Sequence, residues 1–180
     1  TQNQSSAASD VYKRQDRISE FANKFNCDLI INVQGDEPFI NKSDLNLIIH
    51  NFKNDYKNEI EAISLKTLIK NDKEINDPNN VKVITDNNSN AIYFSRLPLP
   101  YNRYGNEIKY YKHVGIYAFR KKALIKFSNL KKSKLEKAEM IEAIRFIENG
   151  MKIKILEVKN NYIGIDTIED LTKARKMFND

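Results

Sequence analysis

Two aspartates, Asp36 and Asp166, each follow an apolar run and a nearby glycine. The run before Asp36, Leu29–Val33, is mostly β-branched and predicts a buried strand. Ligands of open α/β sheets bind beyond the carboxyl ends of strands, and Mg²⁺ takes a few carboxylates while sharing its other positions with phosphates and water. The two side chains therefore predict a magnesium site for phosphoryl chemistry. The alternative is that Asp36 is a turn residue and Asp166 a helix cap.

A second candidate group lies on the predicted strand 110–120. Residues four apart on a strand face the same way, so His113 and Tyr117 share one face, and Gly115 between them leaves that face open. An imidazole and a phenol around such a gap predict a surface that binds polyols. The alternative is an ordinary half-buried strand, in which the polar ends of the His113 and Tyr117 side chains reach water.

Charged side chains provide two further candidates. Arg96 follows a predicted strand and could hold a carboxylate or phosphate in bidentate fashion, or lie on the surface. Glu136, Glu139 and Glu142 form an i, i+3, i+6 stripe on a predicted helix. Such a stripe is usually a solvated face with ion pairs.

The elements that must position these side chains alternate between strands and helices. Apolar spacing and turn residues predict strands over 28–33, 60–65, 81–85, 91–95, 110–120 and 151–158. Apolar spacing and helix caps predict helices over 16–25, from 41 or 43 to 52, over 121–130, over 135–149 and from 167 onward. This alternation predicts an α/β three-layer sandwich. We expect a single domain over 16–180, behind a disordered or foreign lead-in over 1–15.

The composition is that of a soluble globular protein, with 41% hydrophobic and 30% charged residues among 180. No apolar run approaches the ~18–20 residues of a membrane span, so we expect none. The single cysteine, Cys27, favours a reducing compartment, and we expect the cytoplasm. The net charge of +6 is spread over many lysines with acids between them, so we expect no nucleic-acid partner.

Six stretches are specific in combination, although the sequence contains no phosphate loop, no GxGxxG and no CxxC pair. They are NVQGDEPFI (32–40), NDPNNVKVI (76–84), AIYFSRLPLPY (91–101), YKHVGIYAFR (111–120), LEKAEMIEAIRFIENG (135–150) and GIDTIEDL (164–171). Together and in this order they resemble the 3-deoxy-manno-octulosonate cytidylyltransferase family. The resemblance covers nearly all of residues 16–180.

The resemblance implies a fold and a reaction. The fold is a three-layer α/β/α sandwich with a mixed, mostly parallel sheet of the nucleotide-diphospho-sugar transferase type. The reaction joins CTP to 3-deoxy-manno-octulosonate (Kdo) for lipopolysaccharide biosynthesis, giving the CMP-sugar and pyrophosphate. Mg²⁺ would neutralise charge on the attacking side and on the leaving pyrophosphate. Family enzymes are typically dimers, so a homodimer of the complete enzyme is implied as well.

The resemblance also assigns roles to residues of this sequence. They are Asp36 and Asp166 as the catalytic metal ligands, Gln34 at the nucleotide or sugar, Arg96, His113 and Tyr117 at the sugar acid, and Glu142 at sugar hydroxyls.

The sequence departs from the family pattern in two places. Family members begin with a strand and a basic loop, resembling PARxxSxRLPGKPL, that grips the triphosphate, and 1–15 is not a version of it. We therefore expect the C-terminal two-thirds of the enzyme, with little activity alone and an unpaired sheet edge. In addition, Ala143 follows Glu142 where the family commonly has Gln. A cytidylyltransferase for another acid sugar and a non-catalytic binding module on the same scaffold remain alternatives.

Overall fold

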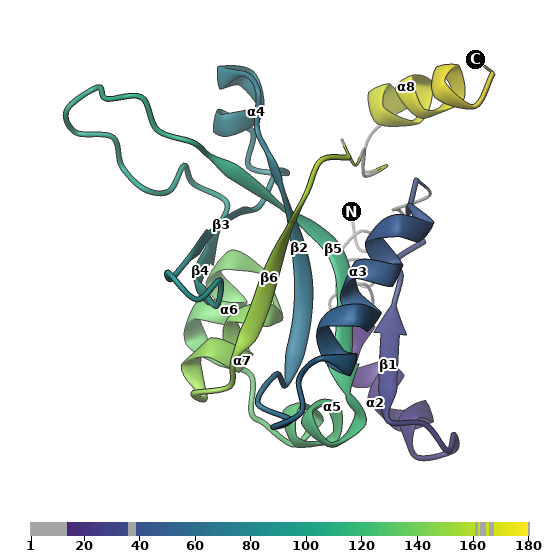
Figure 1. The fold of residues 1–180 in the computed structure, drawn as a ribbon. Helices are drawn as coiled ribbons and strands as arrows, with labels where there is room; N and C mark the ends of the chain where they lie inside the picture. The colour runs from purple at the N-terminus through teal and green to yellow at the C-terminus, as the bar shows by residue number, and fades with distance from the viewer. Residues whose placement is uncertain (1–13, 36–38, 161, 163–164, 166–167, 180) are drawn as a thin grey trace, which may run out of the picture.

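The computed structural model describes residues 14–35, 39–160, 162, 165 and 168–179 (Figure 1). Within these residues, six strands form one sheet. The strands are β1 (Leu29–Asn32), β2 (Ala62–Leu68), β3 (Lys82–Thr85), β4 (Ala91–Ser95), β5 (Tyr111–Arg120) and β6 (Ile153–Val158). The helices are α2 (Arg14–Ala22), α3 (Lys42–Lys53), α4 (Asp72–Asn76), α5 (Lys121–Ser128), α6 (Lys134–Glu139), α7 (Ala143–Glu148) and α8 (Ile168–Asn179).

The sheet is organised around β5. The strand order is β4-β3-β5-β2-β6, and β1 also pairs with β5. Strands β1, β2, β3 and β6 run one way while β4 and β5 run the other, so the sheet is mixed, as the resemblance implies. Among the described strands only β2 and β6 form a parallel neighbouring pair, because β5 lies between strands that oppose it.

One edge of β5 is divided between two strands. The end of β5 pairs with β1, where Asn32 lies opposite Tyr117, and its beginning pairs with β3, where Lys82 lies opposite Lys112. Among the described residues, β1 has no strand on its other side.

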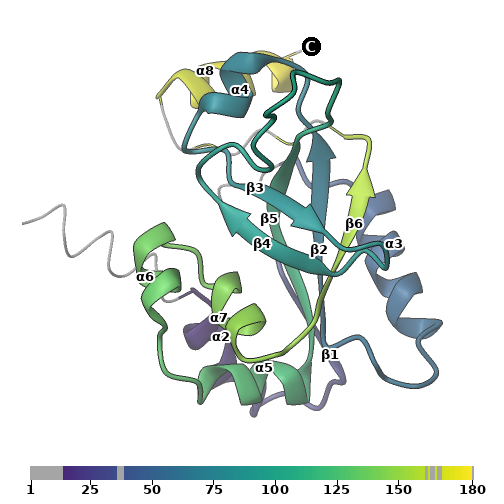
Figure 2. The ribbon, with the colours of Figure 1, turned by 90° about the vertical axis from the view of Figure 1, so that its left-hand side faces the viewer.

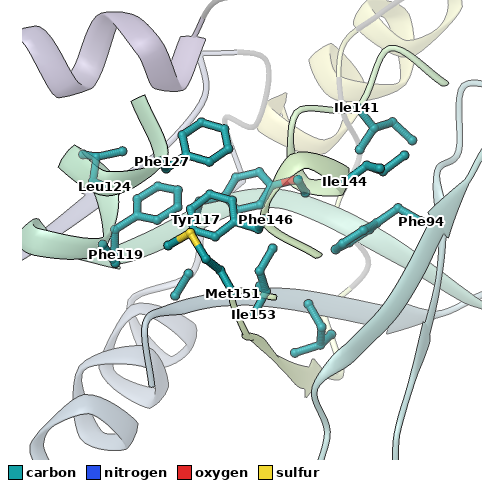
Figure 3. Packing of buried hydrophobic residues seen from close by; sticks show 14 of the residues in the cluster. Phe94, Tyr117, Phe119, Leu124, Phe127, Ile141, Ile144, Phe146, Met151 and Ile153 are labelled. Carbon is teal, nitrogen blue, oxygen red and sulfur yellow. The ribbon is translucent and has the colours of Figure 1, made fainter. Parts of the chain in front are cut away.

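Helices cover both faces of the sheet, which gives the predicted three layers. On one face, α3 packs Ile48 and Phe52 against a cluster from β2 and β5. On the other face, α2, α5 and α7 contribute to a larger cluster with β4, β5 and β6 (Figure 2). Figure 3 shows that second cluster, with Tyr117 among the aromatic rings. None of the helices in the described part of the chain has the length and apolar character that a membrane crossing requires.

Local sequence signals explain several boundaries. The Asn41 side chain caps α3 by accepting a hydrogen bond from the N–H two residues on. Strands β3 and β4 form the predicted hairpin, and the Asp86 side chain accepts hydrogen bonds from the N–H groups of Asn88 and Asn90 in its loop. Gly150, with a φ of +69°, follows α7 in the left-handed conformation that glycine adopts easily. The short helix α4 was not expected from the sequence.

The single helix predicted over 135–149 is wrong, because the structure contains two helices there. Helix α6 ends at Met140, which has a left-handed φ of 56°, and α7 begins at Ala143. The left-handed conformation costs roughly 1–2 kcal/mol for a residue with a side chain. In return, the break lets Ile141 enter the core and brings two charged side chains together between the helices.

Those side chains, Glu136 and Arg145, form a buried bidentate ion pair. Arg145 Nη2 and Nε lie 2.7 and 2.9 Å from the Glu136 carboxylate oxygens, and the two side chains are only 1% and 0% exposed. Arg145 also lies over the Phe127 ring, 4.2 Å from its centroid. The interpretation of the glutamate stripe as a solvated face is therefore wrong for Glu136, which is buried and paired with Arg145.

We expect Arg145→Met to lower the free energy of unfolding by about 3–5 kcal/mol, because it leaves the Glu136 carboxylate buried without its cation. Urea unfolding followed by circular dichroism measures the change.

The matched control is Lys126→Met, which removes an exposed ion pair with Glu61 at 3.6 Å. Exposed pairs contribute about 0–1 kcal/mol, so the control should unfold almost as the original chain does. Equal, small losses in both variants would contradict the importance of the buried pair.

Candidate functional site

The predicted metal ligands Asp36 and Asp166 lie outside the described residues, so their pairing stays a prediction. Among the residues that are described, no group of three or more His, Cys, Asp or Glu side chains is placed to hold a metal ion. The structure does describe the neighbours of both aspartates. Gln34 is half-buried just after β1, and Tyr162 lies four residues before Asp166.

Tyr162 ties the chain after β6 to the beginning of α3. Its hydroxyl donates to Asp44 Oδ2 at 2.5 Å, and the Asn160 amide donates to the same oxygen at 2.6 Å. The Asn41 backbone N–H donates to the Tyr162 hydroxyl at 3.3 Å. Burial, followed by the hydrogen bond to Asp44, raises the pKa of Tyr162 to about 12, so its hydroxyl stays a donor. This network, which we call the Asp44–Tyr162 lock, fixes the chain next to both segments that carry the predicted metal ligands.

His113 and Tyr117 share a face of β5, as the sequence predicts, with ring centroids 5.1 Å apart. The edge of the His113 ring packs against Phe94 at 5.0 Å, and this desolvation lowers the pKa of His113 to about 3. The imidazole is therefore neutral at physiological pH. Burial, and then the charge of Glu142, raises the pKa of Tyr117. Glu142 thus acts on the same face, where it precedes α7.

Two residues on this face were missed by the sequence analysis. Asn32 lies opposite Tyr117 in the β1–β5 pairing, and its buried Nδ2 has no hydrogen-bond partner among the described residues. Ser64, fully buried in β2, contacts His113 Nε2 at 2.8 Å. Neither position has a signal in the sequence, since both depend on strand register. The structure therefore brings Asn32, Ser64, His113, Tyr117 and Glu142 together as one group, which we call the polar face.

Arg96 lies apart from the direct contacts of the polar face, on the exit from β4. Its Nε donates to the Glu139 carbonyl at 2.8 Å and its Nη1 to the Pro78 carbonyl at 2.9 Å. The Glu139 carboxylate accepts from Ser95 Oγ and from the Arg96 backbone N–H. Two of the five N–H donors of the guanidinium therefore hold Arg96 in place, and three remain for solvent or a ligand.

A buried lysine organises the loop beside Arg96. Lys82 is fully buried, and its Nζ donates to the carbonyls of Asp77 and Asn80 at 2.9 and 2.6 Å. Burial lowers the pKa of Lys82, while the nearby charges of Asp77 and Glu139 act in the opposite direction. The loop over 76–80 thus has a fixed shape, which presents the Pro78 carbonyl to Arg96.

Comparison with known proteins shows the class to which this fold belongs. The family model described as cytidylyltransferase matches residues 3–153. The chain therefore belongs to the cytidylyltransferase family.

Within that family, the chain is similar to proteins named 3-deoxy-manno-octulosonate cytidylyltransferase. It is 50% identical to the one from Christiangramia forsetii, in a match that covers 90% of this chain and 66% of the relative. It is 46% identical to the one from Flavobacterium johnsoniae, in a match that covers 92% of this chain and 68% of the relative. A solved structure described as CMP:2-keto-3-deoxy-manno-octonic acid synthetase complexed with CTP superposes with a TM-score of 0.84 at 36% identity, covering 92% of this chain and 67% of that one. These matches confirm the resemblance found in the sequence. The chain spans about two thirds of the length of these relatives.

We expect Tyr162→Phe to lower the free energy of unfolding by about 1.5–3 kcal/mol, because the buried Asp44 carboxylate loses its phenol donor. Urea unfolding at pH 7 measures this. Tyr56→Phe, at a side chain that is 87% exposed, is the matched control and should change stability by less than about 0.5 kcal/mol. If the Asp44–Tyr162 lock contributes nothing to stability, the two variants will have the same free energy of unfolding.

We also expect His113 to make stability pH-dependent. Between its ordinary pKa of 6.5 and the lowered value of about 3, the unfolded chain binds a proton at this residue that the folded chain does not. Stability should therefore fall as the pH decreases through this window, by up to about 1.4 kcal/mol per pH unit from this group. In His113→Gln the unfolding free energy should decline less steeply between pH 6.5 and 4. Parallel curves for the two proteins would contradict the lowered pKa.

Proposed function

We propose that the chain carries the sugar-binding part of a magnesium-dependent cytidylyltransferase site. The proposed reaction transfers CMP from CTP to Kdo and releases pyrophosphate, for lipopolysaccharide biosynthesis in the cytoplasm. The proposal extends to this chain what the names of its relatives state of them.

The observation that carries the proposal is the polar face. A neutral imidazole, a protonated phenol, a carboxylate and a buried amide gather around β5 and the start of α7. Hydrogen-bonding groups of this kind, set among aromatic rings, suit a polyhydroxylated ligand whose apolar ring atoms can pack on the same surface. In the proposed site, His113, Tyr117 and Glu142 hold the sugar, and Arg96 holds its carboxylate with the N–H donors that remain to it.

In this reaction the main task of the protein is to position the two substrates. The anomeric oxygen of the sugar forms a bond to the α-phosphorus of CTP, the bond from that phosphorus to the bridging oxygen breaks, and the hydroxyl proton is released with the departure of pyrophosphate. Holding the sugar in line with that bond converts an encounter between two molecules into a reaction within one complex. The rigid placement of His113 and Tyr117 between Phe94 and Phe119 supports such a role. Gln34, two residues before Asp36, would contact the nucleotide or sugar.

Asp36 and Asp166 would hold the Mg²⁺ ion. The donor chemistry fits, because two carboxylates leave most positions of the ion for phosphates and water. The Asp44–Tyr162 lock supports this assignment, since it joins the chain beside one aspartate to the chain beside the other. When bound, the ion would neutralise charge on the triphosphate.

One observation bears on the identity of the sugar. Ala143, which stands where the family commonly has Gln, is fully buried in the core cluster. Its methyl group offers no hydrogen bond, so a different ulosonic acid is the second candidate substrate. Comparing the binding of Kdo with that of other ulosonic acids separates the two.

We further expect a homodimer. The long excursion between β4 and β5 (Figure 1) carries Leu97, Tyr101 and Tyr104, which are 71%, 84% and 82% exposed. Such exposed apolar side chains are typical of a surface that another chain covers. Light scattering of the purified chain measures its mass.

The test of the proposed function is isothermal titration of the chain with CTP and Mg²⁺, and separately with Kdo. We expect metal-dependent CTP binding that Asp36→Asn weakens by about tenfold or more, the equivalent of at least ~1.4 kcal/mol. His113→Gln should weaken Kdo by a similar factor while leaving CTP binding unchanged.

The matched control for Asp36→Asn is Asp28→Asn, which removes an exposed carboxylate before the other end of β1. It should bind CTP as the original chain does. Absence of any Mg²⁺-dependent CTP binding would instead favour a non-catalytic module. Pyrophosphate release shows whether the chain turns over, and we expect little or none from this chain alone.

A further inference from the structure

Ser64 lies at the point where β5 departs from regular pairing. In the β2–β5 register, Ser64 lies opposite Tyr117 but the next residue, Leu65, lies opposite Val114. Gly115 and Ile116 therefore have no counterpart on β2, which makes this a β-bulge. The bulge turns two β5 carbonyls toward Ser64, whose Oγ lies 2.7 Å from the Ile116 oxygen and 3.3 Å from the Val114 oxygen.

The third contact of Ser64 Oγ is His113 Nε2 at 2.8 Å. A hydroxyl has one hydrogen to donate and can accept two. The Ile116 carbonyl can only accept, and its 2.7 Å distance is that of a formed O–H···O hydrogen bond. The Ser64 hydrogen therefore points to the carbonyl, and the hydrogen between Ser64 and His113 must belong to the imidazole.

We infer that Ser64 is a positioning residue that fixes His113 as the Nε2–H tautomer and leaves Nδ1 as the hydrogen-bond acceptor of the ring. A neutral imidazole has one donor and one acceptor nitrogen, and the hydrogen bond at one nitrogen decides the role of the other. The packing of the ring between Phe94 and Tyr117 holds it in this orientation. The lowered pKa of His113 agrees with a ring that stays neutral.

The tautomer determines what His113 can recognise, and this step rests on the proposed function. A bare Nδ1 accepts a hydrogen bond from a sugar hydroxyl and repels a carboxylate, which has only lone pairs to offer. The neighbouring negative charge of Glu142 likewise favours a ligand group that donates a hydrogen bond over a carboxylate. His113 should therefore accept a hydrogen bond from a hydroxyl of the sugar acid, and the carboxylate of the sugar acid must bind elsewhere.

The test is nuclear magnetic resonance of the whole chain labelled with ¹⁵N-histidine. The sequence has two histidines, so the long-range ¹H–¹⁵N correlation spectrum is simple, and His50→Gln assigns the signals. At pH 7 we expect His113 to show the pattern of the Nε2–H tautomer alone. A pattern for Nδ1–H or for an imidazolium would overturn the inference.

Two variants show whether Ser64 is the cause. In Ser64→Ala the Nδ1–H tautomer should become populated at His113, and in Ser64→Thr, which keeps the hydroxyl, the original pattern should return. The signals of exposed His50, whose Nε2 lies 2.7 Å from Asn54 Nδ2, should stay unchanged in both. An unchanged His113 tautomer in folded Ser64→Ala would contradict the role of Ser64. If Ser64→Ala does not fold, the spectra of the original chain and of Ser64→Thr still decide the tautomer.

Adding Kdo tests the consequence for recognition. The Nδ1 signal of His113 should shift as this nitrogen accepts a hydrogen bond, while the Nε2 proton remains. Ser64→Ala should bind Kdo about three- to tenfold more weakly, and Ser64→Thr should restore most of the affinity. Transfer of the proton to Nδ1 on binding would mean that His113 meets a carboxylate. Complete absence of Kdo binding, with the tautomer as inferred, would count against the proposed function and leave the role of Ser64 standing.

Discussion

The division of one edge of β5 between β1 and β3 is the constraint on which the polar face depends. Had a single strand paired along the whole edge, the stretch between His113 and Tyr117 would lie inside a regular ladder. Instead the pairing on this edge changes partner there, and the bulge at Gly115 and Ile116 lies at the same level of β5, in its pairing with β2 on the opposite edge. Bulges recur beside functional sites because they redirect side chains without unfolding the sheet.

Aromatic packing connects this face to the structural centre of the molecule. From His113 the rings continue through Tyr117, Phe119 and Phe146, with successive centroids 5.1, 5.8 and 5.6 Å apart. Phe146 stacks on Phe127, which lies under the buried arginine of α7. The groups that would meet a ligand are thus supported by the same close-packed rings that hold the helices on the sheet, and such cores resist displacement.

The sequence predicted the elements and the shared face well, because both follow from local periodicity. The hairpin, the cap at Asn41 and the common orientation of His113 and Tyr117 needed no knowledge of distant contacts. The broken helix at Met140 could not be predicted, since it accompanies a buried ion pair between residues nine apart, which local periodicity does not reveal. Ser64 and Asn32 were missed for a related reason: their neighbours on β5 are fixed by register across the sheet.

The Asp44–Tyr162 lock joins residues that are 118 positions apart in the chain. Closing so long a loop carries an entropic cost, which only the assembled sheet between the two ends can offset. Pairings of such large sequence separation also slow the folding of a domain, because the closure cost comes before the contacts that offset it. The Asp44–Tyr162 lock therefore depends on the sheet that lies between its two ends. Affinity for the ion would then report on whether the entire sheet, rather than one loop, has reached its native arrangement.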